Sequence, residues 1–183
     1  MVAQAFVFSF MKKGFILLST ILLLIGGQSK AQNSNTKARL LPEMEVKLLD
    51  GSVAKTTSLL NQKGLTIINF WATWCKPCVL ELNNIKEVFA EWQKETGVKL
   101  IAVSIDDSRT MAKVGPLVSG KGWAYDIVLD PNSELKRKLN VVNPPHTFVV
   151  NAKGEIVWQH SSYSPGDEDE LFEFIKKYTA SNP

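Results

Sequence analysis

The chain has few cysteines and no strong excess of charge of one sign. Among its 183 residues only Cys75 and Cys78 are cysteines, too few for a small domain held together by disulfides. The formal net charge is +3, and no cluster of lysine and arginine could neutralise several phosphates, so nucleic-acid binding is not expected. Internal repeats and low-complexity tracts are also absent. With 45% hydrophobic residues, the chain has enough apolar material for one ordinary globular domain.

Residues 1–31 have the pattern of a secretory signal peptide. Lys12 and Lys13 precede an eleven-residue, largely apolar stretch over 15–25, and small residues follow before Gln32. We therefore expect cleavage before Gln32 and a mature protein in the periplasm or another extracytoplasmic space. A retained membrane anchor is the lesser alternative, because the stretch is shorter than the roughly 20 residues that span a bilayer.

Removal of the signal peptide would change the charge and set the domain limits. Met11 is an alternative start, since an apolar segment precedes the two lysines. Residues 1–31 hold three of the 21 basic residues and no acid, which leaves 18 basic against 18 acidic residues. Residues 32–41 are mostly polar and predict a flexible lead-in, followed by a domain over 42–180. No dimerisation domain is added, so a monomer is expected.

Strand and helix patterns alternate along this domain. The sequence predicts a hairpin around Asp50-Gly51, buried strands, and a second hairpin with a following helix near the C-terminus. Strands are expected over 45–49, 52–55, 65–71, 98–105, 126–129, 146–151 and 155–160, and helices over 77–93, 108–119, 130–139 and from 165 onward. The acidic first turn of the last helix suits the helix dipole better than a recognition role. This order predicts an α/β sandwich with a mixed central β-sheet flanked by helices.

Both cysteines lie in one short motif, Trp74-Cys75-Lys76-Pro77-Cys78, between a predicted strand and a predicted helix. A spacing of three places them on the same face of a helical turn, close to disulfide range. At the helix N-terminus, free N–H groups stabilise a thiolate and lower the pKa of Cys75, which makes it the candidate nucleophile. Cys78 is the candidate resolving cysteine that releases a mixed disulfide. Pro77 suits the first helical turn, where an N–H is not needed.

Three other roles for the cysteine pair are weaker. A structural disulfide across so short a loop removes little entropy from the unfolded chain. Zinc needs about four ligands, and only the distant His146 and His160 could add to the two cysteines. Covalent haem attachment needs a histidine after the second cysteine, where Val79 stands. We therefore expect no metal and no cofactor beyond a redox-active disulfide between Cys75 and Cys78.

The segment Phe70-Trp71-Ala72-Thr73-Trp74-Cys75-Lys76-Pro77-Cys78 resembles the thioredoxin superfamily, and in particular its extracytoplasmic TlpA/ResA-like branch. The resemblance covers roughly residues 40–180, including an added helix and strand between Ile105 and Leu129. It implies a thioredoxin-like fold with a βα insertion and an enzyme of thiol–disulfide exchange. It also implies exported proteins with disulfides as partners, apocytochromes c among them, and a membrane electron donor.

The same resemblance gives roles to residues outside the motif. Pro145 corresponds to the cis-proline that shapes the substrate groove, and Pro144 before it lacks an N–H, which removes one backbone contact with substrate. Asn69 stands where cytoplasmic thioredoxins carry a buried acid, whereas Glu81 matches the acid of the ResA-like branch. Glu81 is therefore the candidate proton acceptor for Cys78, with a pKa raised by burial. The alternative is an exposed helix carboxylate.

Substrate binding is assigned to residues around the motif and the cis-proline. Trp74 is expected to be a partly exposed platform beside Cys75, whereas Trp71 is expected in the core. The candidate substrate-binding residues are Trp74, Lys76, Pro77 and Pro145, and His146 receives no role.

A reductant is favoured over an oxidant, because the Lys76-Pro77 pair resembles the reducing dipeptides. Two alternatives stay open. A thiol peroxidase of related fold would need threonine and arginine around Cys75, and Thr73 is near in sequence. A non-enzymatic copper carrier would use the two thiolates and a histidine.

Overall fold

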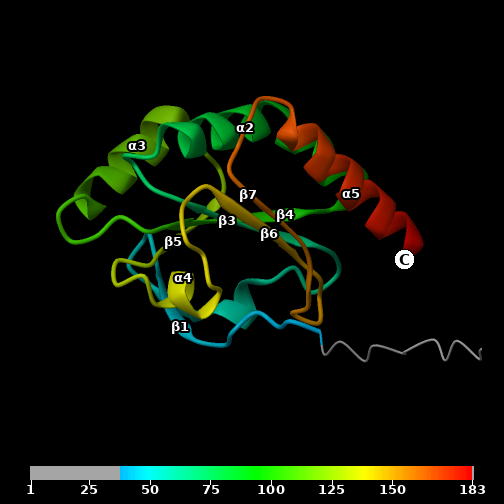
Figure 1. The fold of residues 1–183 in the computed structure, drawn as a ribbon, viewed down its shortest axis with the longest axis horizontal. Helices are drawn as coiled ribbons and strands as arrows, with labels where there is room; N and C mark the ends of the chain where they lie inside the picture. The colour runs from blue at the N-terminus through cyan, green and yellow to red at the C-terminus, as the bar shows by residue number, and fades with distance from the viewer. Residues whose placement is uncertain (1–37, 183) are drawn as a thin grey trace, which may run out of the picture. The chain divides into compact units, whose positions relative to one another are not determined.

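The computed structural model describes residues 38–182, which contain a seven-stranded β-sheet with helices on both faces (Figure 1). The predicted signal peptide over 1–31 and residues 32–37 of the predicted lead-in lie outside the described residues. Within 38–182, no helix combines the length and the apolar character needed to cross a membrane.

The sheet is mixed, as predicted, with the strand order β2-β1-β5-β4-β3-β6-β7. The three central strands β3, β4 and β5 run parallel to one another, and all other neighbours pair antiparallel. The strands are β1 (Glu45–Leu48), β2 (Val53–Lys55), β3 (Thr66–Trp71), β4 (Lys99–Ser104), β5 (Asp126–Leu129), β6 (His146–Val150) and β7 (Ile156–Ser161). Both predicted hairpins, β1–β2 and β6–β7, are therefore confirmed.

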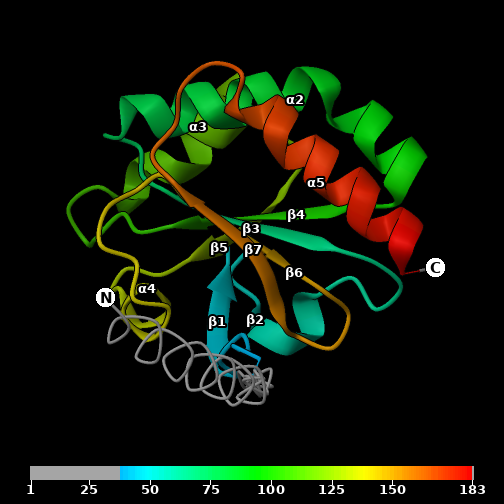
Figure 2. The ribbon, with the colours of Figure 1, turned by 45° about the vertical axis from the view of Figure 1, so that its right-hand side comes forward.

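The helices form two layers around this sheet. They are α2 (Lys76–Thr96), α3 (Val114–Lys121), α4 (Glu134–Lys138) and α5 (Asp167–Ser181), with short 3-10 turns η1 (Thr56–Leu59) and η2 (Met111–Lys113). Both views place α2, α3 and α5 on one side of the sheet and α4 on the other (Figures 1 and 2). The helix α3 and the strand β5 are the predicted βα insertion.

The central strand β3 is buried along its whole length, which explains its continuous apolar sequence. On one side, Ile68 lies with Leu135 of α4 around a small apolar cavity. On the other side, the Trp71 ring meets Trp123 edge to face, with ring centroids 5.0 Å apart. Trp71 is thus a core residue, as predicted, and the strand's C-terminal end is fixed directly before the cysteine motif.

The helix predicted over 108–119 begins later, at Val114. The Asp107 carboxylate accepts the Arg109 N–H over 3.0 Å, and the Asp107 carbonyl accepts the Thr110 N–H over 3.0 Å. These bonds offer the backbone a turn in place of a regular helix, so the helix starts only after η2.

The helix predicted over 130–139 is likewise short and covers only Glu134–Lys138. The Asp130 carboxylate accepts three backbone N–H groups of this first turn, from Glu134, Leu135 and Lys136. Asp130 therefore precedes the helix and stabilises its N-terminus instead of forming part of it.

The end of the predicted flexible lead-in is bound to the domain. The Arg39 carbonyl accepts the Ile156 N–H, the Leu41 N–H donates to the Gly154 carbonyl, and the Leu41 side chain is buried. The expectation of a flexible lead-in is thus wrong for residues 39–41, because pairing beside the β6–β7 hairpin satisfies their backbone groups.

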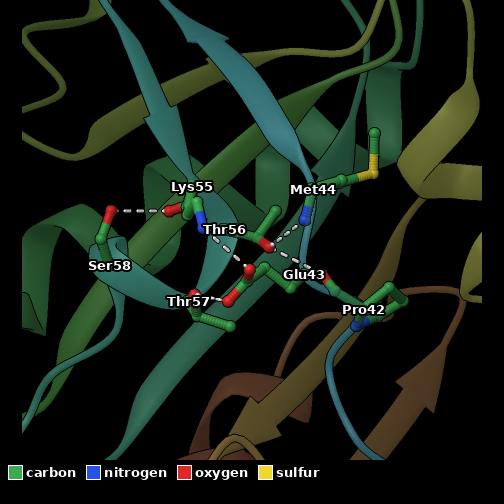
Figure 3. A network of polar contacts seen from close by, with 7 residues as sticks. All are labelled: Pro42, Glu43, Met44, Lys55, Thr56, Thr57 and Ser58. Atoms are coloured by element: carbon green, nitrogen blue, oxygen red, sulfur yellow. Dashed lines mark hydrogen bonds and ion pairs between the residues drawn. The ribbon is translucent and has the colours of Figure 1, made fainter.

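A network of polar contacts continues this attachment into the first hairpin (Figure 3). The Thr56 hydroxyl donates to the Pro42 carbonyl over 2.6 Å and accepts the Met44 N–H over 3.1 Å. The Glu43 carboxylate forms an exposed ion pair with Lys55 at 3.0 Å. The entry of the chain into β1 is therefore tied to the start of η1.

Candidate active site

The two cysteines lie where β3 gives way to α2, and they form a disulfide with Cα atoms 5.3 Å apart. Cys75 is the N-cap residue of α2, and its sulfur accepts the Cys78 N–H over 3.3 Å. Pro77 occupies the first helical turn, as predicted. Cys75 is 6% exposed whereas Cys78 is fully buried. Of the two sulfurs, the one at the helix N-terminus is therefore the one an incoming thiol or disulfide can reach.

Three residues of the cysteine motif are exposed to solvent. Trp74 is 58% exposed, and Lys76 and Pro77 are also exposed. The expected exposed platform beside Cys75 is thus present. A large aromatic surface open to solvent next to a reactive sulfur is suited to contact a protein partner.

The proline pair is brought next to the motif by the start of β6. The Pro144–Pro145 peptide bond is cis, as the resemblance implies. Pro145 and Pro77 together line a hollow of about 460 Å³, which also takes in Val142 and Tyr163. Trp74 and Lys76 do not line this hollow. Two of the four candidate substrate-binding residues, Pro77 and Pro145, thus line one hollow, whereas Trp74 and Lys76 are exposed beside Cys75 without lining it.

Glu81 is buried, at 6% exposure, and the alternative of an exposed helix carboxylate is wrong. Burial is the largest influence on its pKa and raises it to about 7, since a charged carboxylate is poorly solvated there. The hydrogen bond from Thr147 and the nearby Asn69 amide act in the opposite direction, and the negative charges of Asp167 and Glu168 add to the rise. A carboxylate with such a pKa can both accept and return a proton near neutral pH.

Two buried polar residues connect to Glu81 from the sheet. Thr147 of β6 donates to Glu81 Oε1 over 2.8 Å and accepts from Asn69 Nδ2 over 2.8 Å. Asn69 of β3 and Thr147 stand directly opposite each other in the antiparallel pair. Sequence reasoning singled out Asn69 but missed Thr147, because its contact depends on the register between two strands 78 residues apart.

A further residue missed by sequence reasoning supports the loop before Cys75. The buried Asp106 carboxylate accepts the Thr73 N–H over 2.8 Å, the Thr73 hydroxyl over 2.5 Å and the Ser104 hydroxyl over 2.9 Å. Asp106 follows β4, and the carboxyl ends of the parallel strands β3 and β4 meet at one edge of the sheet. The parallel pairing of β3 with β4 is the one signal that could have pointed to Asp106, because it places Asp106 beside the end of β3.

Metal ligation has no support in the part of the chain that the structure describes. No three His, Cys, Asp or Glu side chains there form a group able to hold a metal ion. His146 instead stacks on Phe148, with ring centroids 4.4 Å apart, and His160 pairs with Asp167 at 3.3 Å.

The arrangement as a whole defines a class of protein. A mixed sheet between helical layers, a CxxC disulfide at a helix N-terminus and a nearby cis-proline are the features of thioredoxin-like proteins that exchange disulfides. The same fold also carries other chemistry: a peroxiredoxin Q from Xanthomonas campestris matches with a TM-score of 0.65 and 18% identity, over 74% of this chain and 91% of that one. That likeness shows the fold alone, so the site decides the activity.

Comparison with known protein families supports the assignment to thioredoxin-like proteins. Residues 38–159 match the model of the AhpC/TSA family, and the chain belongs to this family. The thiol-disulfide oxidoreductase ResA of Oceanobacillus iheyensis is 30% identical over 154 residues, covering 78% of each chain. A thioredoxin-like protein from Porphyromonas gingivalis, solved in solution, shares 43% identity with a TM-score of 0.70, over 78% of this chain and 94% of that one. The protein is a thiol–disulfide oxidoreductase of thioredoxin-like fold.

Proposed function

We propose that this oxidoreductase works outside the cytoplasm as a reductant of disulfides in exported proteins. The observation that carries the proposal is the asymmetric disulfide, with Cys75 reachable at the helix N-terminus and Cys78 buried on the helix face that also carries Glu81. An accessible nucleophile paired with a shielded resolving thiol is the arrangement that two-step dithiol exchange requires.

In the reduced protein, the Cys75 thiolate attacks one sulfur of the substrate disulfide. The S–S bond of the substrate breaks, one substrate sulfur leaves as a thiolate and takes a proton, and a mixed disulfide remains on Cys75. Cys78 then loses its proton and attacks the Cys75 sulfur, which releases the second substrate thiol. Two electrons pass to the substrate, and the Cys75–Cys78 disulfide is formed.

Glu81 serves as the proton acceptor of the second step. Its carboxyl group is three residues beyond Cys78 on the same helical face, and its pKa of about 7 leaves a sizeable fraction ionised at neutral pH. When the disulfide is reduced again, the same group returns the proton to Cys78. The position used by the buried acid of cytoplasmic thioredoxins holds Asn69, which cannot take a proton.

Substrate binds at the hollow lined by Pro77 and Pro145, and the exposed Trp74 and Lys76, the neighbours of Cys75 in the motif, add contacts. Pro144 offers a carbonyl but no N–H to an extended substrate backbone, so one backbone hydrogen bond is unavailable there. Binding therefore depends more on side-chain contacts than on pairing with the backbone of this segment.

The cellular setting of the proposal follows from residues 1–31 and from the relatives. These residues have the pattern of a signal peptide, which would be cleaved before Gln32 and leave the domain in the periplasm or a similar compartment. Disulfides persist there, so a reductant needs a membrane electron donor to return it to the dithiol form. Apocytochromes c, whose cysteines must be reduced before haem attachment, are the substrate class we propose. N-terminal sequencing of the exported protein should find Gln32 first.

The reduction potential tests the direction of exchange. The chain is equilibrated in redox buffers, and free thiols are trapped and counted by mass spectrometry. A potential near about −270 mV, the value of thioredoxin, supports a reductant. A potential near about −120 mV would show a disulfide-forming oxidant instead. A peptide carrying an oxidised C-x-x-C-H segment tests the substrate class, because the reduced protein should reduce it.

Thiol peroxidase activity is the second candidate, and the family match favours testing it. Such an enzyme needs an arginine at the reactive cysteine, but each of the three arginines contacts other groups: Arg39 binds the Leu139 carbonyl and Gln159, Arg109 binds Asp107, and Arg137 binds the Asn132 carbonyl. The Cys78→Ser variant separates the two functions. Dithiol exchange predicts no hydrogen peroxide turnover by this variant, whereas rapid turnover would support a peroxidase.

A further inference from the structure

A chain of buried polar side chains runs from the centre of the sheet to α2. Asn69 Nδ2 donates to Thr147 Oγ1 over 2.8 Å, and Thr147 Oγ1 donates to Glu81 Oε1 over 2.8 Å. All three side chains are buried in the core. Polar groups in such a place cost free energy unless they are paired, and this row stands where an apolar core would otherwise be expected.

The direction of these hydrogen bonds distinguishes the two carboxylate oxygens of Glu81. A hydroxyl has a single proton to donate, and Thr147 directs it to Oε1 while its own oxygen accepts from Asn69. Oε1 is thereby held as an acceptor. Oε2 is also buried, and among the described residues it has no hydrogen-bond partner. Of the two oxygens, Oε2 is therefore the one with a free position for an incoming proton.

We propose that Thr147 and Asn69 are positioning residues for disulfide exchange, which hold Glu81 through Oε1 so that Oε2 takes up and returns the Cys78 proton. The proposal rests on the proposed function, in which Glu81 serves Cys78. When the Cys78 thiol attacks the mixed disulfide, its proton passes to Oε2 and its electron pair forms the new S–S bond to Cys75. The bond from Cys75 to the substrate breaks, and the substrate thiolate leaves with the electron pair of that broken bond and takes a proton from water.

The charged groups that face Glu81 come from the elements packed on α2. Asp167 and Glu168 on α5 act on its pKa by charge repulsion, and the Tyr163 hydroxyl before α5 donates to Glu168 over 2.7 Å. From β7, His160 pairs with Asp167 at 3.3 Å. The side chains that approach Glu81 from β3 and β6 are the uncharged Asn69 amide and the Thr147 hydroxyl. Removal of the hydroxyl therefore takes away a bond that stabilises the charged carboxylate and leaves the repulsion in place.

The test compares Thr147→Val with Thr147→Ser in the full chain. Valine keeps nearly the shape of threonine but lacks the hydroxyl, whereas serine keeps the hydroxyl. The Glu81 side chain is labelled with ¹³C at its carboxyl carbon, and its pKa is read by NMR titration of the oxidised protein. We expect Thr147→Val to raise the Glu81 pKa by about one unit, and Thr147→Ser to bring it back close to the unsubstituted value.

A matched control and a kinetic measurement complete the test. Thr66 is a second buried threonine in the sheet, and its hydroxyl accepts from the Asn61 N–H instead of contacting Glu81. Thr66→Val should leave the Glu81 titration unchanged. The rate at which the reduced protein reduces a disulfide peptide is then followed over pH 5–9. Its inflection should move upward in Thr147→Val by the amount found by NMR.

The outcomes separate this inference from the proposed function. A folded Thr147→Val protein whose Glu81 titrates as in the unsubstituted chain would overturn the positioning role, as would a shift that serine does not reverse. If instead the NMR shift appears but Glu81→Gln keeps the unsubstituted pH–rate profile, the positioning of the carboxyl stands. In that case the proposed role of Glu81 in moving the Cys78 proton is wrong.

Discussion

At the scale of single residues, the two cysteines differ in what can reach them. Cys75 caps α2 and keeps a small exposed area of 6%, whereas Cys78 is fully buried one turn later. We therefore expect Cys78→Ser to accumulate a stable mixed disulfide with a substrate protein, since the resolving thiol is missing. Cys75→Ser should form almost none. Mass spectrometry under non-reducing conditions measures both, and equal trapping by the two variants would contradict the assigned roles.

Glu81 should make the stability of the oxidised protein depend on pH. Its pKa is about 7 in the folded protein against an ordinary value of 4.5, so the folded state holds a proton that the unfolded state has lost. The free energy of unfolding therefore falls as the pH rises from about 4.5 to 7, and the contribution is about 3 kcal/mol. Glutamine at this position does not titrate, so Glu81→Gln should remove that part of the slope.

Urea unfolding at pH 5 and pH 8 measures this difference. Glu91→Gln alters an exposed glutamate of the same helix and should keep the unsubstituted pH dependence. If Glu81→Gln and the unsubstituted protein lose the same stability between the two pH values, the raised pKa is not a property of the folded state.

At the scale of secondary-structure elements, the loop between β3 and α2 is held by a residue of another strand. Asp106, after β4, accepts both the N–H and the hydroxyl of Thr73, two residues before Cys75. Asp106→Ala would leave these donors without their partner, and we expect the free energy of unfolding to fall by about 2–3 kcal/mol. Exchange through Cys75 should slow by roughly tenfold, since the nucleophile is no longer held in place.

The neighbouring Asp107 provides the control for this prediction. Its ion pair with Arg109 lies at the surface, so Asp107→Ala should leave the free energy of unfolding close to that of the unsubstituted protein. Denaturant unfolding and stopped-flow measurements distinguish the two variants. An Asp106→Ala protein with unchanged exchange kinetics would show that the loop holds its position without the carboxylate.

Local patterns account for most of the elements and for the cysteine motif, but not for contacts that depend on register. The run over 65–71 predicts β3 because a strand covered on both faces is apolar throughout. The Asn69–Thr147 bond depends on the pairing of β3 with β6, which no short stretch of sequence contains. The predicted start of α3 is wrong for a different reason: the Asp107 side chain accepts the Arg109 N–H and so competes with helical hydrogen bonding of the backbone.

At the scale of the whole domain, the surface around the reactive sulfur contains exposed apolar residues. Trp74 is 58% exposed beside Cys75, and Val142 is 75% exposed at the hollow that Pro77 and Pro145 line. Exposed apolar side chains near a reaction centre are suited to bind a partner, and a few such residues carry most of the binding free energy. A small dithiol does not need this surface, whereas a protein disulfide does.

We therefore expect Trp74→Ala and Val142→Ser to weaken exchange with a protein disulfide while leaving reduction by dithiothreitol close to normal. Loss of an aromatic contact of this size costs about 1–2 kcal/mol, which is roughly a five- to thirtyfold rise in KM. Val53→Ser is the control, because Val53 is 63% exposed on the edge strand β2, at the opposite end of the strand order from β7. Equal losses with both substrates would indicate damage to the cysteines themselves. Equal losses in all three variants would place the binding surface elsewhere.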